Sequence, residues 1–225
     1  MDRDTLNRHF AIGDIHGCET TFKKLLKKID LQPSDNLYIL GDMIDRGNSS
    51  AGVLNKIIKL REKGYNIFPI RGNHEQMVID ILESDPYKIH AYLRYFHSED
   101  LLGFKGNIRK RYREFLSSLP YYYELENFIL VHASLDLSSG NIFNDINIML
   151  YPKYHIGNTM NLKGKTLIHG HMVQDLKLIM KNINEKSRII GIDNGCVLGN
   201  TRKGVGNLLC LNLDTMELII QKFSD

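Results

Sequence analysis

The sequence predicts an α/β fold in a single domain that spans residues 1–225. Short apolar runs alternate with amphipathic segments through residues 9–70, a pattern typical of parallel strands joined by helices. A chain of 225 residues with 43% hydrophobic and 24% charged residues has the size and composition of one globular domain. Because short strand patterns dominate from residue 165 onward, we expect the back half to be mostly antiparallel β.

The front half predicts the order strand, helix, strand, helix, strand. The three apolar runs are residues 9–12, 37–40 and 65–70. Between them, residues 20–29 and 53–60 carry apolar side chains at helical spacing, with lysines on the opposite face of the first segment. Such an order implies that the three strands pair in parallel through right-handed crossovers.

The middle of the chain predicts a helical segment, residues 76–119, broken at Pro86 and at Gly103–Gly106. Its aromatic side chains fit helix faces that pack on the core, and a cap over a functional site is an equally good interpretation. Two short strands are expected on either side of a turn at Glu126–Asn127. The later strands are expected at residues 166–168, 178–180, 188–192, 207–213 and 217–221.

Composition excludes several classes of protein. Three widely spaced cysteines, Cys18, Cys196 and Cys210, do not suit a disulfide framework, so we expect reduced thiols. The polar residues 1–8 do not resemble a signal peptide, and no apolar run approaches the roughly 18 residues that span a bilayer. We therefore expect a cytoplasmic protein with no membrane partner. The net charge of +3 is too small to indicate a nucleic-acid partner.

Metal-type side chains follow the apolar runs at the points where the predicted strands end. This is the edge at which open α/β sheets place their functional sites. The blocks are Gly13-Asp14-Ile15-His16-Gly17, Gly41-Asp42-Met43-Ile44-Asp45-Arg46-Gly47, Arg71-Gly72-Asn73-His74-Glu75, His132-Ala133 and His169-Gly170-His171. We therefore expect five loops to meet at one site.

The residue types in these blocks suit divalent cations. Asp14 and His16 are two positions apart, so at an extended strand end they share a face and can hold one ion. Asp42 offers two oxygens and can bridge two ions. An amide oxygen of Asn73 and the imidazoles of His132 and His171 complete a mixed nitrogen and oxygen set of candidate ligands. Such a set suits manganese, iron or zinc better than calcium.

Each block alone also has a purely structural explanation. An Asp-x-His pair is common by chance, and the Gly41–Gly47 block could be a loop that caps a helix. A single His132 at a strand end would more often be a hydrogen-bonded core histidine. All five blocks occur in order, each behind an apolar run, so coincidence is improbable and the joint pattern indicates a metal site.

The first three blocks resemble the signature blocks of the phosphoprotein-phosphatase family, within the calcineurin-like metallophosphoesterases, and most of all its bacterial serine/threonine phosphatases. Val131-His132-Ala133 and Gly170-His171 are similar to the two later histidine blocks of the family, and the similarity runs from Phe10 to about Leu213. The resemblance implies a metallophosphoesterase fold, with two facing mixed β-sheets flanked by helices and the metals at a loop-rich edge.

The same resemblance implies two divalent cations per chain, with manganese expected first and iron or zinc as alternatives. One cation would be held by Asp14, His16 and Asp42, and the other by Asp42 together with Asn73, His132 and His171. His169 is the alternative to His171. Further roles are implied for four residues: His74 as general acid, Asp45 as the carboxylate that orients it, and Arg46 and Arg71 as phosphate-binding groups. A hydroxide shared by the metals would attack phosphorus.

One block departs from the family. Bacterial relatives carry Leu-Trp-x-Arg, and this chain has Leu150-Tyr151-Pro152-Lys153, so Lys153 is expected to take the place of the arginine that binds phosphate. Lysine keeps the charge but loses the two-pronged guanidinium geometry. The departure bears on substrate preference more than on metal binding.

The leading interpretation is a protein serine/threonine phosphatase, with tyrosine phosphate also considered, acting on a phosphoprotein or a small phosphoester. Symmetrical dinucleoside-tetraphosphate hydrolysis is the first alternative, ranked second because the chain has no large extension to form a nucleotide cleft. A nuclease ranks third. A metal-binding scaffold without catalysis is the alternative from another class, disfavoured by the presence of His74, Asp45, Arg46 and Arg71.

Overall fold

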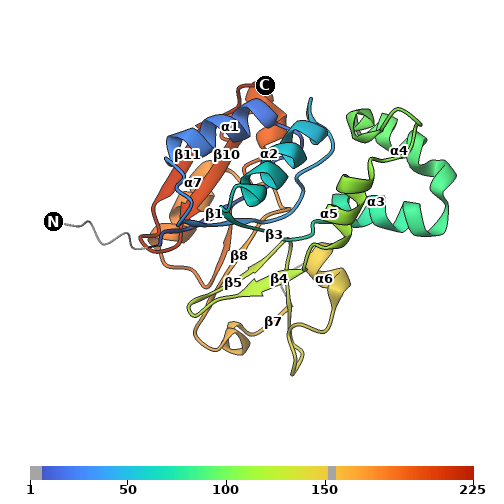
Figure 1. Ribbon diagram of the computed structural model, residues 1–225. Coiled ribbons are helices and arrows are strands. Elements are labelled where there is room, and N and C mark those ends of the chain that lie inside the picture. The colour runs from blue at the N-terminus through green and yellow to red at the C-terminus, as the bar shows by residue number, and fades with distance from the viewer. Residues whose placement is uncertain (1–6, 152–155) are drawn as a thin grey trace.

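The computed structural model describes residues 7–151 and 156–225, and its core consists of two β-sheets packed face to face (Figure 1). The first sheet has the strand order β11-β10-β1-β2-β3 and the second has the order β4-β5-β8-β9. The strands of the first sheet are β1 (His9–Ile12), β2 (Asn36–Ile39), β3 (Asn66–Pro69), β10 (Asn207–Asn212) and β11 (Leu218–Lys222). Those of the second are β4 (Tyr122–Glu124), β5 (Phe128–Val131), β8 (Thr166–His169) and β9 (Ile189–Gly191).

The first sheet is mixed. Strand β1 pairs in parallel with β2, Ala11 beside Tyr38, and β2 pairs in parallel with β3. On its other side β1 pairs antiparallel with β10, Ala11 beside Leu211. The predicted parallel pairing of the three front strands is therefore confirmed. It brings the loops after β1, β2 and β3 to one edge of the sheet.

The second sheet corrects one expectation from the sequence. Strands β5, β8 and β9 are parallel, and only β4 is antiparallel to its neighbour, so the prediction of a mostly antiparallel back half holds for β10 and β11 but is wrong for β8 and β9. Residues 178–180, expected as a strand, lie in helix α7 (Leu176–Asn184), which connects β8 to β9. Its apolar residues Leu176, Ile179 and Ile183 recur at helical spacing, and the Asp175 side chain caps its first turn.

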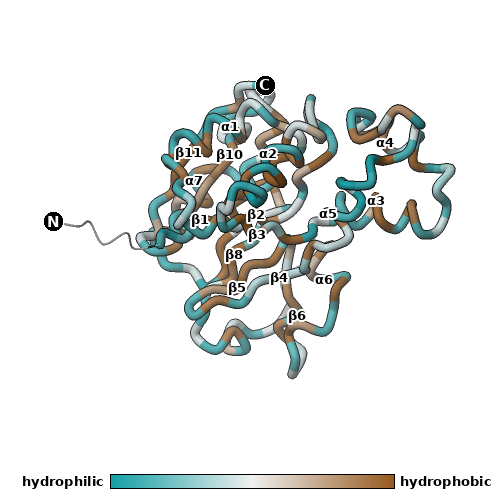
Figure 2. The backbone as a smooth tube through the Cα atoms, in the orientation of Figure 1, coloured by the Kyte–Doolittle hydropathy of each residue, from teal (hydrophilic) through white to brown (hydrophobic). Residues whose placement is uncertain are grey.

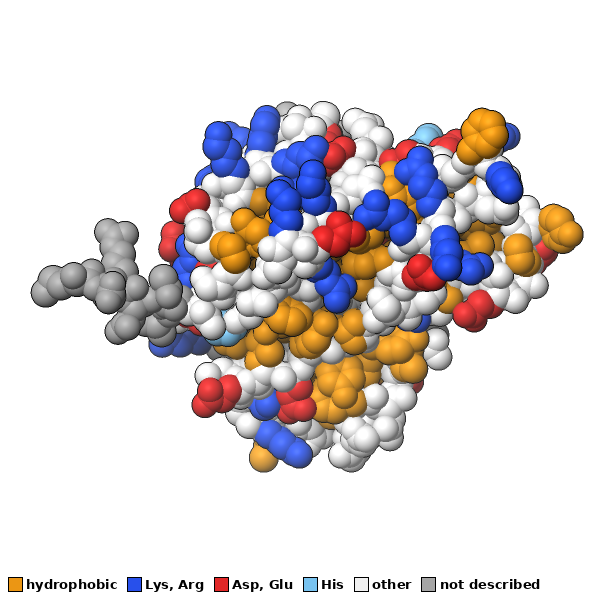
Figure 3. Space-filling model, in the orientation of Figure 1, with side chains coloured by type: hydrophobic (Ala, Val, Ile, Leu, Met, Phe, Trp, Pro, Cys, Tyr) orange, Lys and Arg blue, Asp and Glu red, His pale blue; other side chains and the backbone are white. Residues whose placement is uncertain are grey.

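The alternation of side chains along the strands builds two layers of core. Phe10 and Ile12 of β1 pack under helices α1 (Glu19–Lys28) and α2 (Ser50–Glu62), whereas Ala11 faces the second sheet. Figure 2 shows the apolar strands inside and the polar helix surfaces outside. Lysine and arginine side chains cover the outer surface of the molecule over α1 and α2 (Figure 3). This arrangement leaves the strand-end loops free to carry polar side chains.

The segment expected to be helical forms a separate lobe beside the sheets (Figure 1). A short turn at Pro86 breaks it, as predicted. Its elements are α3 (Asn73–Ser84), η1 (Pro86–Lys88), α4 (Ile89–Tyr95), η2 (Glu99–Leu101) and α5 (Lys110–Ser117). The remaining elements are β6 (Asp136–Leu137), α6 (Ile146–Leu150), β7 (Ile156–Gly157), η3 (Thr159–Leu162) and η4 (Cys196–Thr201).

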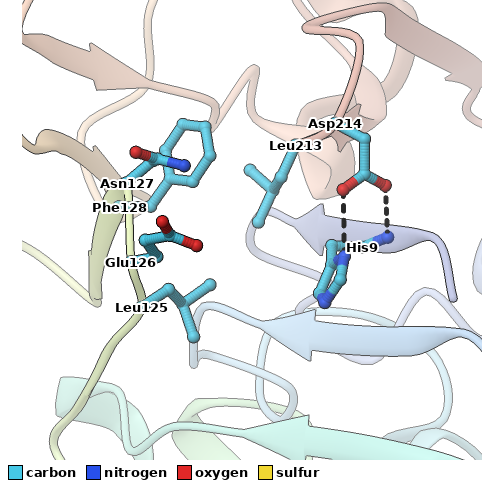
Figure 4. Close-up of a pocket in the computed structure, with 7 residues that line it drawn as sticks. All are labelled: His9, Leu125, Glu126, Asn127, Phe128, Leu213 and Asp214. Carbon is cyan, nitrogen blue, oxygen red and sulfur yellow. Dashed lines mark hydrogen bonds and ion pairs between the residues drawn. The ribbon is translucent and has the colours of Figure 1, made fainter.

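A surface cleft opens at the sheet edge remote from the loops that follow β1, β2 and β3 (Figure 4). It lies between the start of β1 and the β4–β5 turn, where the His9 backbone amide donates to Asp214 at 2.7 Å and its ring Nδ1 lies 2.9 Å from the same carboxylate. None of the predicted metal ligands lines this cleft. In the part of the chain that the structure describes, Cys18, Cys196 and Cys210 are free and buried, and no helix is long and apolar enough to cross a membrane.

Candidate metal centre

The loops after β1, β2, β3, β5 and β8 bring the predicted ligands to one point. Asp42 stands at the middle of the group: its Oδ2 lies 3.4 Å from Nε2 of His16, and its Oδ1 lies 3.5 Å from Nε2 of His132. All three side chains are buried. Asp42 therefore belongs to two clusters of possible ligands, one on each side of its carboxylate.

One cluster joins Asp42 to Asn73, His132 and His171. Nε2 of His132 lies 3.0 Å from both Asn73 Oδ1 and His171 Nδ1, and His171 Nδ1 lies 3.0 Å from Asn73 Oδ1. The His132 Nδ1–H donates to the Leu40 carbonyl at 2.7 Å, so the lone pair of Nε2 points into the cluster. Three atoms that face one another in this way fit a cation in the space they enclose.

The other cluster joins Asp42 to His16 and His74. The His16 Nδ1–H donates to the Ile44 carbonyl at 3.0 Å, which again leaves the Nε2 lone pair toward Asp42. Asp14, predicted as a ligand here, is buried next to the centre, and its two oxygens accept the His171 backbone amide at 3.0 and 3.1 Å. His74, predicted as the general acid, brings its Nε2 to 4.0 Å from Asp42 Oδ2.

Burial sets the charge state of these groups. It lowers the pKa of His16 to about 3 and of His171 to about 4, and it also lowers the pKa of His132, so the imidazoles stay neutral as metal ligation requires. Burial raises the pKa of Asp14, and the nearby Asp193 and Asp42 carboxylates raise it further. Neutral imidazoles around crowded buried carboxylates fit divalent cations, whose positive charge would offset the negative charge of the carboxylates.

The backbone of the loops is strained where these side chains are attached. Positive φ angles are uncommon for residues other than glycine and cluster at functional sites. Half of the ten such residues in the described chain are predicted site residues. They are His16 (φ 45°), Asp42 (44°), Asp45 (72°), Arg46 (69°) and His171 (63°). The loops are thus held in shapes that aim their side chains at the centre.

Glu75 is the residue that holds the Asp42 loop, and sequence reasoning gave it no role. Its buried carboxylate accepts the backbone amides of Asp42 at 2.9 Å, Met43 at 2.7 Å and Gly72 at 2.8 Å. The signal for it was present, because a glutamate at the third position of a helix commonly reaches back to cap it. Close backbone contact requires glycine beside it: a Cβ on Gly41 would lie 2.7 Å from Gly72 Cα.

His74, Asp45 and Arg46 form a connected group on one side of the centre. The His74 Nδ1 lies 2.7 Å from Asp45 Oδ2, and both side chains are fully buried. The exposed Arg46 places one guanidinium nitrogen 2.8 Å from His74 Nε2 and the other 3.0 Å from His16 Nε2. The structure thus brings together the two residues that the sequence proposed for acid catalysis, His74 and Asp45, and one of those it proposed for phosphate binding, Arg46.

Arg71 lies apart from this group. Its guanidinium donates to Gln76 Oε1 at 2.8 Å and to the Ser117 carbonyl at 2.8 Å, and it stacks on the Tyr121 ring at 4.8 Å. It ties the end of β3 to the helical lobe, and its role in phosphate binding stays a prediction. Lys153, the other predicted phosphate ligand, lies outside the described residues.

His169 and His171 differ in their surroundings. His171 turns its Nδ1 to the cluster, whereas His169 is buried with its Nδ1 2.9 Å from the Gly170 carbonyl. The geometry therefore favours His171 over His169 as the ligand. Asp193, which was not among the predicted site residues, is buried close enough to Asp14 to raise the pKa of Asp14.

Two facing mixed sheets with adjoining carboxylate and imidazole clusters at one edge define a metallophosphoesterase. The chain belongs to the calcineurin-like phosphoesterase family, whose sequence profile matches residues 8–182. The symmetrical bis(5'-nucleosyl)-tetraphosphatase of Acidovorax ebreus is 45% identical over 67 residues, 29% of this chain and 23% of that protein. That of Haemophilus ducreyi is 32% identical over 132 residues, 56% of this chain and 44% of that protein. The matched regions thus span less than half of these relatives.

Protein phosphatases are also among the relatives. Serine/threonine-protein phosphatase 1 of Salmonella typhimurium is 43% identical over 75 residues, 32% of each chain. A solved structure described as a candidate diadenosine tetraphosphatase has a TM-score of 0.70 at 20% identity and covers 99% of this chain and 96% of its own. A serine/threonine phosphatase from Saccharomyces cerevisiae has a TM-score of 0.62 at 18% identity and covers 97% of this chain and 80% of its own. These two structures share the fold with this chain.

Proposed function

We propose that the chain is a metal-dependent phosphatase that hydrolyses phosphate ester or anhydride bonds. The observation that carries the proposal is the position of Asp42, which belongs to two ligand clusters at once. The family match and the phosphatase names of its relatives support the same class of enzyme.

The donor set indicates which cations fit. Neutral imidazoles, carboxylates and one amide oxygen, without thiolate, suit manganese, and iron or zinc can take the same ligands. Asp42 with His16 and Asp14 would hold one cation, and Asp42 with Asn73, His132 and His171 would hold the other. Cations bound there supply positive charge to phosphoryl oxygens and lower the pKa of a water molecule.

The side chains around the clusters would bind and protonate the substrate. Arg46 is exposed and lies beside both His16 and His74, so its two-pronged guanidinium can bind phosphoryl oxygens. His74 lies next to it, with Nδ1 fixed by Asp45 and Nε2 toward the centre. When substrate phosphate takes the Arg46 guanidinium and His74 is protonated, Nε2 can give its proton to the leaving oxygen as it departs.

For the substrate, we propose symmetrical dinucleoside tetraphosphates. The sequence ranked this substrate second to phosphoprotein, but the similar proteins from Acidovorax ebreus and Haemophilus ducreyi carry the tetraphosphatase name. Chain length, which argued against a nucleotide cleft, loses weight because a chain of nearly equal extent is described as a candidate diadenosine tetraphosphatase.

An exposed aromatic residue could take a nucleobase. Tyr95 is 77% exposed, and its ring contacts Phe96 edge to face at 4.8 Å, while Phe96 lies 5.1 Å from the His74 ring. Stacking of one base on an aromatic side chain contributes about 1–3 kcal/mol. Tyr95→Ala should therefore raise KM for diadenosine tetraphosphate on the order of tenfold and leave p-nitrophenyl phosphate unaffected. Tyr87→Ala, at a 95% exposed tyrosine, serves as the control.

Phosphomonoester hydrolysis is the second candidate. A proton donor matters most when the leaving oxygen is strongly basic, as the serine oxygen of a phosphoprotein is, and the firmly held His74–Asp45 pair suits that task. The Salmonella typhimurium relative supports this reading, since it is named a serine/threonine-protein phosphatase.

One substrate panel separates the candidates. The protein, loaded in turn with manganese, iron or zinc, is offered diadenosine tetraphosphate, a phosphoserine peptide and p-nitrophenyl phosphate. The proposal expects diadenosine tetraphosphate to give only ADP, at the highest kcat/KM. Preference for the peptide would replace it with the second candidate. A metal-loaded protein that hydrolyses none of the three would indicate a scaffold without catalysis.

A further inference from the structure

The Asp45 carboxylate is held by more than its histidine. It is fully buried and accepts three side-chain hydrogen bonds: from His74 Nδ1 at 2.7 Å, from the Tyr92 hydroxyl at 2.5 Å and from the Ser98 hydroxyl at 2.6 Å. His74 is the second residue of α3, directly after the end of β3, at the start of the helical lobe. Tyr92 and Ser98 come from further along the helical lobe, 47 and 53 residues along the chain from Asp45.

The Ser98 contact belongs to a closed ring of hydrogen bonds. Ser98 is fully buried and gives its hydroxyl proton to Asp45. Its oxygen must then accept the proton of Ser50, 2.8 Å away, while Ser50 accepts the Asp45 backbone amide at 2.8 Å. Each hydroxyl in the ring thus has one donor role and one acceptor role. The ring fixes both the backbone and the side chain of Asp45.

The Tyr92 contact completes the enclosure of the carboxylate. Burial and the Asp45 charge both raise the pKa of Tyr92, so the phenol remains a donor. The end of the same helix also contacts Arg46. The Phe96 carbonyl accepts the Arg46 backbone amide at 2.6 Å. The Phe96 ring packs against His74 with 5.1 Å between centroids. Residues 92–98 therefore contact Asp45, Arg46 and His74.

This geometry has a chemical consequence for His74. With both Asp45 oxygens occupied by hydroxyl donors, the carboxylate can turn neither away from the imidazole nor toward another partner. The Nδ1–H of His74 is thereby kept on Asp45, and Nε2 is kept toward the centre. Substitution of residues that hold a functional side chain in place by hydrogen bonds commonly lowers activity about 10- to 100-fold.

We propose that Tyr92 and Ser98 are positioning residues, through which the helical lobe holds the His74–Asp45 pair in the orientation needed to protonate a leaving group. The proposal rests on the phosphatase activity proposed above. It gives the helical lobe a part in catalysis beyond packing. The positioning role applies to any substrate of the enzyme. Its effect on kcat is expected to be larger when the leaving group needs a proton in order to depart.

Substrates with different leaving groups distinguish a positioning role from general structural damage. p-Nitrophenolate leaves without a proton, whereas a serine alkoxide requires one. Tyr92→Phe and Ser98→Ala should each lower kcat on a phosphoserine peptide about tenfold and kcat on p-nitrophenyl phosphate less than about twofold. KM and metal content should not change. Tyr87→Phe removes a hydroxyl from a 95% exposed tyrosine of the same lobe and serves as the control.

A double-mutant cycle adds a second readout. In a His74→Asn background, Tyr92→Phe should cause no further loss, because the group that it positions is gone. Equal losses on both substrates, or additive losses in the cycle, would overturn the proposal and leave Tyr92 and Ser98 as packing residues.

A measurement without turnover keeps the two proposals apart. The Nδ1–H proton of His74 should give a protected NMR signal that His74→Asn removes, and Tyr92→Phe should broaden it or speed its exchange with water. If the wild type hydrolyses no phosphoester but this signal responds as expected, the proposed function fails, whereas the finding that Tyr92 and Ser98 hold the His74–Asp45 pair in place stands. An unchanged signal in both variants at Tyr92 and Ser98 contradicts the positioning role.

Discussion

At the scale of single residues, Asp42 is the one carboxylate shared by the two proposed cation sites. Asp42→Asn replaces the one carboxylate shared by both clusters with a neutral amide, so we expect loss or scrambling of both metal sites. Elemental analysis of the purified protein, reporting metal per chain, measures this directly. Asp30→Asn at an exposed carboxylate is the control. Two metals per chain with full activity in Asp42→Asn would refute the bridging role.

Substitution of His74 tests whether acid catalysis and metal binding belong to different residues. As general acid, it should be dispensable for metal binding, and His74→Asn should lower turnover on the order of 10²- to 10⁴-fold. Its Nε2 also lies within 4.0 Å of Asp42, so the geometry alone would allow it to bind a cation. Metal content measured beside kcat separates these roles, since a collapse of metal content would make His74 a ligand.

At the scale of elements, Glu19 connects the starts of α1 and α2. Its carboxylate accepts the Ser49 hydroxyl at 2.8 Å, and Ser49 caps α2. The hydrogen bond from Lys23, followed by that from Ser49, lowers the pKa of Glu19 from its ordinary value of 4.5. A carboxyl with a lowered pKa stabilises the fold above its unfolded pKa, and this contribution is lost as pH falls through the folded pKa.

Glu19→Gln should therefore reduce the free energy of unfolding at pH 7, by less than about 1 kcal/mol because water screens the partly exposed pair. Urea unfolding of both proteins at pH 7 and again below pH 4 is the measurement. The difference between them should shrink at the lower pH. A difference that stays constant would mean that the ion pair has no share in it.

At the scale of the whole molecule, the two sheets and the helical lobe meet at the metal centre, so cations should stabilise the entire fold. Metal at 100 times its Kd adds about 2.7 kcal/mol to the free energy of unfolding. For a chain of this size that corresponds to a rise in Tm of about 5–10 °C over the chelated protein. Thermal unfolding with and without chelator measures the rise, which Asp42→Asn should abolish.

The sequence by itself determined which residues are the candidates for the chemistry and how the front of the fold is built. Apolar runs followed by glycine and a ligand are local patterns, and the crossover order implies parallel strands whose ends share an edge. The cluster of Asp42, Asn73, His132 and His171 could therefore be named from the sequence before the distances between its members were known. The signals for helix α7 are also local: Asp175 caps it, and Ile179 and Ile183 recur at helical spacing. A short apolar run at 178–180 nevertheless suggested a strand.

Only the tertiary structure decided what the helical lobe does and which residues surround the ligands. The lobe's periodicity predicts helices, but it does not say that Tyr92 and Ser98 reach Asp45 across 47 and 53 residues of chain. It likewise does not say that Arg71 turns to Gln76 and the Ser117 carbonyl. Such contacts depend on how separate elements pack together, and a hydrogen bond between distant residues leaves no period or spacing in the sequence.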